Sequence, residues 1–222
     1  MRASDPSPSS AHTNAAVVPS QLATLLPLKP GERVGLFGGS FNPAHEGHLH
    51  VARMGLERLG LDRVVWLVSP QNPLKAGQET LTLKARMDGV RRLARDPAMI
   101  VSDVEARAGL AYSVDTIAAL QAAFPETEFV WLMGSDNLQG FQRWRDWRTI
   151  ARSIPIAVVA RPGSLLAQRT SAFAREFADV RLRERDARRL AGLRAPVWVY
   201  LKGELNPASS TALRSRLRAP VD

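Results

Sequence analysis

Two histidines stand three residues apart in a segment that begins with two glycines, Gly38-Gly39-Ser40-Phe41-Asn42-Pro43-Ala44-His45-Glu46-Gly47-His48. The apolar run before it, from Val34 to Phe37, is typical of a buried strand. Glycines at a strand end let a phosphate approach the backbone, and the N–H groups at the start of a following helix favour anions. Both imidazoles can donate hydrogen bonds to phosphate oxygens. The segment therefore predicts a phosphate-binding site that includes His45 and His48.

Other sites built from the same residue types fit this segment less well. A zinc-protease helix needs histidines at i and i+4, whereas His45 and His48 stand at i and i+3 with no third ligand evident. No Gly-Lys-Ser/Thr follows the glycines, so the Walker loop is absent, and the dinucleotide fingerprint does not match either. A histidine pair without the surrounding motif would more often be two ordinary residues at a helix start, and His50 belongs to no motif.

A second cluster of phosphate-binding residue types lies near the other end of the chain, in Asn206-Pro207-Ala208-Ser209-Ser210-Thr211-Ala212-Leu213-Arg214. Hydroxyls and unpaired N–H groups at a helix start, with an arginine one turn further on, can hold a polyphosphate. The simpler interpretation is a capped terminal helix over residues 209–217. The segment becomes informative only together with the first one.

The elements that must position these residues alternate between strands and helices. Apolar runs predict strands at 34–37, 64–68, 129–133, 156–160 and 197–201, and 99–104 is predicted to be a further, partly polar strand. Helical patterns cover 47–59, 83–94 and 113–124, and a long charged helical region leads to the last strand. Such alternation predicts a single Rossmann-like α/β domain, a doubly wound parallel sheet with helices on both faces. Ligands of such sheets bind beyond the carboxyl ends of the strands, after Phe37, Val68, Met133 and Ala160.

Composition narrows the class of protein further. The chain has 222 residues, no cysteine, and 30 Lys and Arg against 21 Asp and Glu, a net charge of +9. A basic balance suits nucleic acid, an anionic membrane or phosphorylated small molecules. No stretch approaches the roughly 18 apolar residues of a membrane span. We expect residues 1–30 to form a flexible tail, residues 31–222 to form the catalytic domain, and the protein to be cytoplasmic.

The first segment resembles the opening motif of the nucleotidyltransferase superfamily whose hallmark is His-x-Gly-His. Asn42 stands where many members have Asp, and both residue types can cap a turn. The resemblance implies that His45 and His48 are catalytic and stabilise charge on the α-phosphate of ATP. It also implies an ATP-binding role for the residues of the glycine turn, which are Gly38, Gly39, Ser40 and Phe41.

The second segment resembles the phosphate motif Ser-Ser-Thr-x-x-Arg of the same superfamily. That resemblance assigns Ser209, Ser210 and Thr211 to the β- and γ-phosphates of ATP and makes Arg214 a third catalytic residue. Leu213 stands where a β-branched residue is common. Two phosphate motifs at opposite ends of an α/β domain form a specific pattern.

Further segments resemble the branch that acts on pyridine nucleotides, the bacterial-type nicotinate-nucleotide adenylyltransferase family. They are Pro70 to Lys75, Tyr112 to Thr116, Gly134 to Leu138, Phe141 to Trp147 and Val159 to Gly163, the last near the adenine side. The resemblance places Gly134 and Asp136 on ATP. It assigns the mononucleotide to Ser40, Asn42, Lys75, Ser113, Trp144 and Arg145, with Trp144 stacking on the pyridine and Trp147 in the core.

The reaction implied by this resemblance joins the AMP part of ATP to nicotinate mononucleotide. We expect Mg²⁺ to arrive with ATP rather than in a protein-held site, and we expect neither nucleic acid nor a membrane as a partner; self-association into a homo-oligomer stays open. A sister transferase acting on phosphopantetheine or a cytidylyl acceptor is the nearest alternative, and the segments around Ser113 and Trp144 argue against it. A basic RNA-binding module is the alternative from another class, but no RNP-type aromatic strand or GXXG loop is present.

Overall fold

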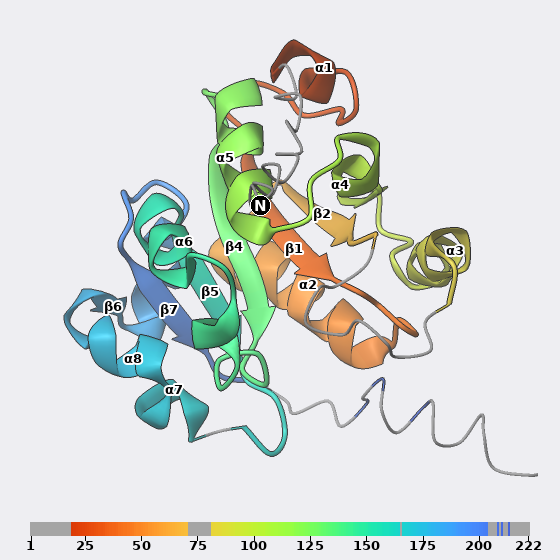
Figure 1. The fold of residues 1–222 in the computed structure, drawn as a ribbon. Helices are drawn as coiled ribbons and strands as arrows, with labels where there is room; N and C mark the ends of the chain where they lie inside the picture. Colours follow the sequence, from red (N-terminus) through yellow and green to blue (C-terminus); the bar gives the residue numbers. More distant parts are fainter. Residues whose placement is uncertain are drawn as a thin grey trace, which may run out of the picture.

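The computed structural model describes residues 19–70, 81–164 and 166–203, together with residues 208, 210 and 213. In this part of the chain, seven strands form one sheet in the order β3-β2-β1-β4-β5-β7-β6 (Figure 1), and every pairing is parallel. The strands are β1 (Arg33–Gly39), β2 (Arg63–Val68), β3 (Met99–Ser102), β4 (Glu128–Gly134), β5 (Ile156–Val159), β6 (Arg181–Leu182) and β7 (Trp198–Leu201).

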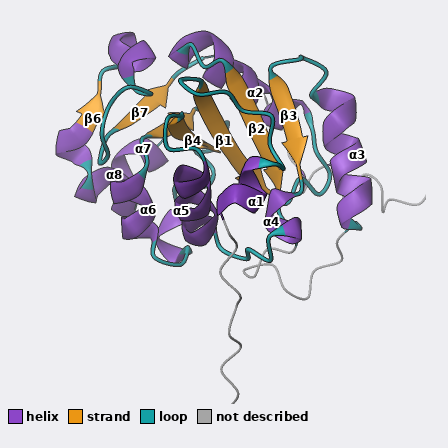
Figure 2. Ribbon diagram, turned by 90° about the horizontal axis from the view of Figure 1, so that it is seen from above, coloured by secondary structure: helices purple, strands orange, loops and turns teal. Residues whose placement is uncertain are grey.

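Helices cover both faces of this sheet (Figure 2). One face carries α2 (Glu46–Leu59), α3 (Leu83–Leu93) and the 3₁₀ helix η4 (Glu184–Arg189). The other carries α1 (Pro19–Ala23), α4 (Val104–Arg107), α5 (Ser113–Ala123), η2 (Phe141–Arg143), α6 (Trp147–Ser153), α7 (Ala167–Thr170), α8 (Ala172–Glu176) and η3 (Ala178–Val180). The predicted doubly wound α/β fold is confirmed.

Two hydrophobic clusters fill the spaces between the sheet and its helices. Successive residues of a strand point to opposite faces, so Leu36 joins the cluster beneath α5 and Phe37 joins the cluster beneath α2. Strands β1 and β4 are apolar almost throughout because they lie in the middle of the sheet with both faces covered. The central strands therefore hold their carboxyl ends in fixed positions.

The strand order reverses between β1 and β4, which are paired neighbours. Their pairing runs from Arg33 opposite Glu128 to Phe37 opposite Leu132, so both strands end at the same edge of the sheet. In doubly wound sheets this reversal opens the crevice in which ligands bind. The segments after Gly39 and after Gly134 both start there. The glycine–histidine loop, residues 38–48, therefore lies at the predicted edge of the sheet.

A helix that packs on the core lies within the segment that we expected to be a tail. Helix α1 packs against α5, and Leu22 and Leu26 are 0% and 3% exposed within the core cluster of that face. The prediction of a flexible tail through residue 30 is therefore wrong for residues 19–30. Pro19 and Pro27 obscured a short apolar helix that was too small to show a clear period. Residues 1–18 lie outside the described part of the chain.

Two other expected elements also differ from the structure. The strand expected over 99–104 ends at Ser102, whose hydroxyl accepts a hydrogen bond from the backbone N–H of Val104 (3.1 Å) and starts the short helix α4. The expected long charged helix is broken into α7, α8, η3 and η4, with the two-residue strand β6 between them. Ser171 caps α8 by accepting from the N–H of Ala174, so the region restarts rather than continues.

Candidate active site

The loop between β1 and α2 is held in a strained turn by buried aromatic rings. Phe41 has a φ of 45°, a left-handed conformation that is rare for a large side chain. Its ring is 2% exposed and packs edge-on against His48 (centroids 5.0 Å apart) and close to Phe37 (5.4 Å) and Trp66 (5.2 Å). Only the backbone of Phe41 is thus available for the predicted ATP contact, and its ring supports His48.

The two glycines at the end of β1 make room for rings of the protein itself. A Cβ atom at Gly38 would lie 2.6 Å from the Trp131 ring, and one at Gly39 would lie 3.0 Å from the Phe41 ring. We expected these glycines to leave space for a phosphate. The space beside both is instead filled by aromatic side chains, so ring packing accounts for the residue type at these positions.

The two motif histidines lie face to face at the start of α2. Their ring centroids are 3.7 Å apart with an interplanar angle of 27°. The backbone N–H of His45 donates to Nδ1 of His48 over 3.3 Å. Because Nδ1 of His48 accepts this bond, its ring proton is on Nε2, which makes Nε2 the donor of this imidazole. The fold therefore fixes both the position and the tautomer of His48.

His45 is buried, at 6% exposure, and its environment favours the neutral ring. Burial, and to a lesser extent the charge of the nearby Arg161 guanidinium, together lower the pKa of His45 from 6.5 to about 4. At neutral pH, His45 can therefore act as a neutral hydrogen-bond donor. The positive charge beside it comes from Arg161.

Arg86 on α3 joins three loop segments of the site through four backbone carbonyls. Its Nη1 donates to Ser40 (2.8 Å) and Ser69 (2.7 Å), its Nη2 to Pro70 (2.8 Å) and its Nε to Leu81 (3.1 Å). The side chain is 2% exposed, and burial lowers its pKa. Five N–H donors in a rigid fork suit such a role. Arg86 thus fixes the glycine–histidine loop relative to the end of β2.

The first motif and the second motif meet in space. The Ser210 hydroxyl donates to the carbonyl oxygen of Pro43 over 3.0 Å, although 167 positions separate the two residues. Arg161, which follows β5, donates from Nη2 to the carbonyl oxygen of Ala208. The predicted ATP residues Ser209, Thr211 and Arg214 lie outside the described residues. The described part of the second motif lies against the loop that carries the histidines.

The turn after β4 is tied to the same region. The Ser135 hydroxyl accepts from the backbone N–H of Arg161 (2.8 Å) and lies 2.7 Å from the Ser164 hydroxyl. Gly134 ends β4, and Asp136 follows it with an exposed side chain. An exposed carboxylate at this strand end can accept hydrogen bonds from hydroxyl groups, which suits the ATP contact that the resemblance implies for Asp136.

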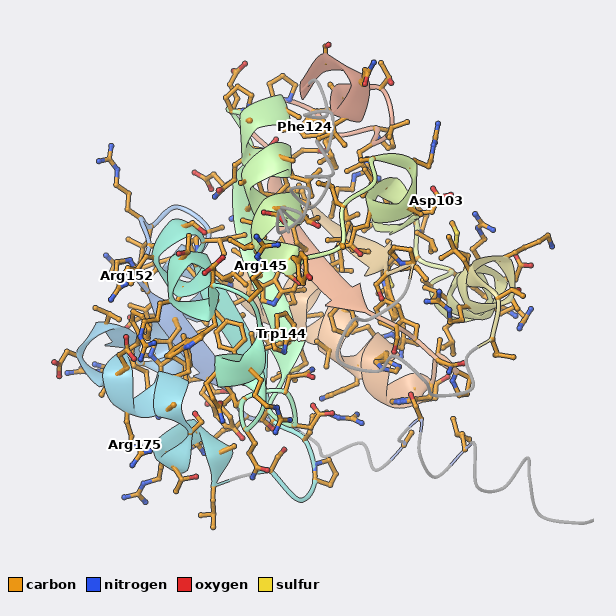
Figure 3. The ribbon with its side chains drawn as sticks, in the orientation of Figure 1. Asp103, Phe124, Trp144, Arg145, Arg152 and Arg175 are labelled. Atoms are coloured by element: carbon orange, nitrogen blue, oxygen red, sulfur yellow. The ribbon has the colours of Figure 1, made fainter. Side chains whose placement is uncertain are left out.

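A second set of predicted residues gathers at the start of α5. Ser113 is the first residue of this helix, and the Arg145 guanidinium lies 4.5 Å from the centre of the Tyr112 ring. Trp144 is partly buried against Trp131, with centroids 6.1 Å apart. Figure 3 shows Trp144 and Arg145 beside the N-terminal end of α5. Trp147 is 7% exposed and belongs to the core, as predicted.

The other predicted residues of the mononucleotide set are Asn42, Lys75 and Ser40. Asn42 is 8% exposed, and its Oδ1 accepts from the backbone N–H of Leu81 over 3.2 Å, which fixes the entry to α3. Lys75 lies outside the described residues, as do all of 71–80. The Ser40 carbonyl accepts from Arg86, so its backbone is anchored at the site.

A buried pair beneath the start of α5 was not predicted from the sequence. Thr116 Oγ1 lies 2.9 Å from Oε1 of Glu105 and 3.2 Å from the carbonyl oxygen of Tyr112. Burial raises the pKa of Glu105 to about 7, and the hydrogen bond from Thr116 opposes that shift. The sequence gives little indication of this pair, because the helix that contains Glu105 is too short to show a periodic pattern of buried residues.

Arg86 and Arg161 were also missed as working parts of the site, although Arg161 stands in a segment that we had singled out. Arg86 follows Leu83 by three residues and precedes Val90 by four, so it occupies the apolar face of its helix, and that position was the available signal. Arg161 follows an apolar strand directly, at an edge where ligands bind. In the described part of the chain, no group of three or more His, Asp or Glu residues is arranged to hold a metal ion.

A doubly wound parallel sheet with paired histidines at the start of the helix after β1, and a serine motif folded onto the same loop, defines a nucleotide-binding α/β protein of the transferase type. Residues 36–216 match the cytidylyltransferase-like family, and the chain belongs to this family. None of the helices in the described residues is both long enough and apolar enough to cross a membrane.

Similar proteins carry a more specific name. The chain is 58% identical over 184 residues to a probable nicotinate-nucleotide adenylyltransferase of Caulobacter sp. (strain K31), covering 83% of this chain and 97% of that protein. It is 52% identical to a protein of the same name from Parvibaculum lavamentivorans, covering 85% of this chain and 94% of the relative. The solved structure of Plasmodium falciparum nicotinic acid mononucleotide adenylyltransferase complexed with NaAD shares the fold, with a TM-score of 0.65 at 12% identity and 86% of each chain covered.

Proposed function

We propose that this protein transfers the AMP part of ATP to nicotinate mononucleotide, giving deamido-NAD and pyrophosphate, a step of NAD biosynthesis. The observation that carries the proposal is the hydrogen bond from Ser210 to the Pro43 carbonyl, because it brings two phosphate-binding motifs into one site. The names of the closely similar relatives support the choice of reaction and of acceptor.

The reaction is an in-line displacement that needs no covalent enzyme intermediate. An oxygen of the mononucleotide's 5′-phosphate forms a bond to the α-phosphorus of ATP. The bond from that phosphorus to the bridging α,β-oxygen breaks, and the bonding electron pair leaves with pyrophosphate. A phosphate monoester is already ionised at neutral pH, because its second pKa is about 6. No general base is required.

The work left to the protein is positioning and charge stabilisation. Nε2 of His48 and the neutral ring of His45 donate to oxygens of the α-phosphate as negative charge grows there, and the N-terminus of α2 adds its positive potential. Arg214 is assigned to the departing phosphates by its motif. Magnesium carried by ATP would neutralise the triphosphate while keeping several of its waters.

The start of α5 would select the acid form of the mononucleotide over the amide. Helix N–H donors and the Ser113 hydroxyl suit the two oxygens of a nicotinate carboxylate, whereas the amide NH₂ would place a donor against donors. An unmet buried polar group costs roughly 1–3 kcal/mol, so we expect at least about a tenfold preference for the acid in kcat/KM. Trp144 would stack on either ring alike.

A pyrophosphate-release assay with ATP, Mg²⁺ and a panel of phosphorylated acceptors tests the proposal. The panel contains nicotinate mononucleotide, its amide, phosphopantetheine and CTP-dependent acceptors. We expect turnover with the acid, weaker turnover with the amide and none with the others. Turnover with phosphopantetheine alone would contradict the proposal and show that the protein is the sister transferase that acts on that acceptor. A cytoplasmic location stays a prediction.

A further inference from the structure

The guanidinium of Arg161 lies against the first turn of α2. A Cβ atom at Gly47 would overlap its terminal nitrogens, so the absence of a side chain at Gly47 is what lets the guanidinium approach the helix. Arg161 itself is 7% exposed. Its backbone is held by Ser135, and its Nη2 is held by the carbonyl oxygen of Ala208. The position of this side chain is therefore fixed from three directions.

One side of this guanidinium has no acceptor in the described part of the chain. Nη1 is fully buried and makes no hydrogen bond, and no carboxylate there forms an ion pair with Arg161. Leaving a donor of a buried charged group unpaired is costly. The positive end of the α2 dipole points at the same place, which makes a cation there still less favourable. The guanidinium and the helix N-terminus together give this place a positive potential, which an anion would neutralise.

We propose that Arg161 is a phosphate-binding residue of the ATP site, in which Nη1 donates to an oxygen of the triphosphate bound at the start of α2. This inference rests on the proposed function and adds to it a residue that joins the two motifs. Arg161 contacts the first motif at Gly47 and the second at Ala208. An arginine fork that has one nitrogen on the protein and another toward the ligand suits a tetrahedral oxyanion.

The pairing of Arg161 with His45 divides two tasks. Burial and the guanidinium charge keep His45 neutral, with its pKa at about 4. His45 then contributes a directed hydrogen bond, while Arg161 contributes the positive charge. A site with a charged His45 and an uncharged residue at 161 would supply the same total charge but lose it as the pH rises through the histidine pKa.

Direct binding measurements test this assignment on the full-length protein. Calorimetric titrations compare inorganic tripolyphosphate and adenosine as probes on wild type, Arg161→Met and Arg161→Lys. The exposed Arg175→Met on α8 is the matched control for loss of one positive charge. We expect Arg161→Met to weaken tripolyphosphate by roughly 10- to 100-fold, in line with a charge-assisted hydrogen bond. Lysine should lose less, adenosine should bind equally to all, and Arg175→Met should match wild type.

Gly47→Ala provides an independent variant, because its new Cβ would displace the guanidinium without removing a charge. We expect it to reproduce the loss of tripolyphosphate binding. In kinetics, Arg161→Met should raise KM for ATP and leave KM for the mononucleotide close to wild type, which also shows that the variant is folded. In NMR titrations, the His45 pKa should rise in Arg161→Met but stay below 6.5, because burial, the larger cause of its lowering, remains.

The outcomes separate this inference from the proposed function. Wild-type binding of tripolyphosphate by folded Arg161→Met, with an unchanged KM for ATP, would overturn the assignment while AMP transfer stood. Absence of AMP transfer by the wild type, together with tripolyphosphate binding that depends on Arg161, would overturn the proposed function and retain the phosphate site.

Discussion

Nη1 of Arg86 donates to the carbonyl oxygen of Ser40 over 2.8 Å, and this bond attaches α3 to the loop that carries the motif histidines. The same nitrogen reaches Ser69 at the end of β2 (2.7 Å). A buried cation with four carbonyl partners is satisfied only by a guanidinium, because lysine offers three donors from a single nitrogen. All four hydrogen bonds of Arg86 go to backbone carbonyls, so we expect it to act as a positioning residue.

Arg86→Lys should lower kcat/KM clearly while changing the melting temperature only slightly. Lysine keeps the charge but cannot reach all four carbonyls, so the loop is held less precisely, and small misplacements cost up to about 100-fold in rate. Arg86→Met should also unfold at a lower temperature, since it leaves four partly buried carbonyls without their donor. Melting curves and steady-state kinetics on both variants, with the exposed Arg95→Lys as control, measure the two effects. Unchanged kcat/KM in Arg86→Lys would contradict the role.

His48→Ala should keep the fold and lose turnover. Removal of one preorganised donor to a developing charge typically costs about 10² to 10³ in kcat. His50→Ala is the matched control, because it removes a neighbouring imidazole that belongs to no predicted motif position. The measurement is single-turnover formation of the dinucleotide. Turnover of folded His48→Ala within a few-fold of wild type would remove His48 from the mechanism.

Glu105 should give the protein a specific dependence of stability on pH. Its folded pKa, about 7, lies above the ordinary 4.5, so the folded protein binds a proton that the unfolded chain has already released between those values. The stabilisation is complete below about pH 4.5 and is lost as the pH rises toward 7, by up to about 3 kcal/mol. In its protonated form Glu105 can donate to Thr116, which frees the threonine hydroxyl for the Tyr112 carbonyl.

Glu105→Gln is the test of that dependence, because glutamine keeps a donor and does not titrate. Denaturant unfolding from about pH 5 to about pH 8 should show wild type losing stability relative to Glu105→Gln as the pH rises. Glu126→Gln, at an exposed position, serves as the control. Parallel profiles for wild type and Glu105→Gln would show that the carboxyl is already ionised in the folded protein.

Removal of residues 1–30 should destabilise the protein, whereas removal of residues 1–18 should leave the melting temperature close to that of the full chain. The longer deletion takes Leu22 and Leu26 out of the core cluster beneath α5. Leu22→Ala alone should cost about 2–5 kcal/mol, the usual range for a buried leucine. Thermal melts of the three proteins decide the point. Equal melting temperatures for both deletions would mean that α1 contributes nothing.

The continuous apolar strands and the two phosphate motifs were predictable because they depend on local composition. The apolar run from Val64 to Val68 predicts a buried strand without any knowledge of its neighbours. The spacing of His45 and His48 is likewise visible in the sequence itself. The tertiary partners were not predictable in the same way. In the sequence, Arg86 is one of many helix arginines, and only the fold shows that three loops present carbonyls to it. The contact between Gly47 and Arg161 likewise depends on the fold and not on local sequence. Short elements such as α1 and β6 depend on contacts rather than on periodicity.

Transfer of the α-phosphorus of ATP to nicotinate mononucleotide is the central claim, and isotope position tests it directly. The wild-type protein is incubated with Mg²⁺, nicotinate mononucleotide and ATP labelled either at the α- or at the γ-phosphorus, and the products are separated by chromatography. The account predicts that the α-label appears in deamido-NAD and the γ-label appears in pyrophosphate, in equal molar amounts. Transfer of the γ-label to the mononucleotide, or the absence of any dinucleotide, would contradict it.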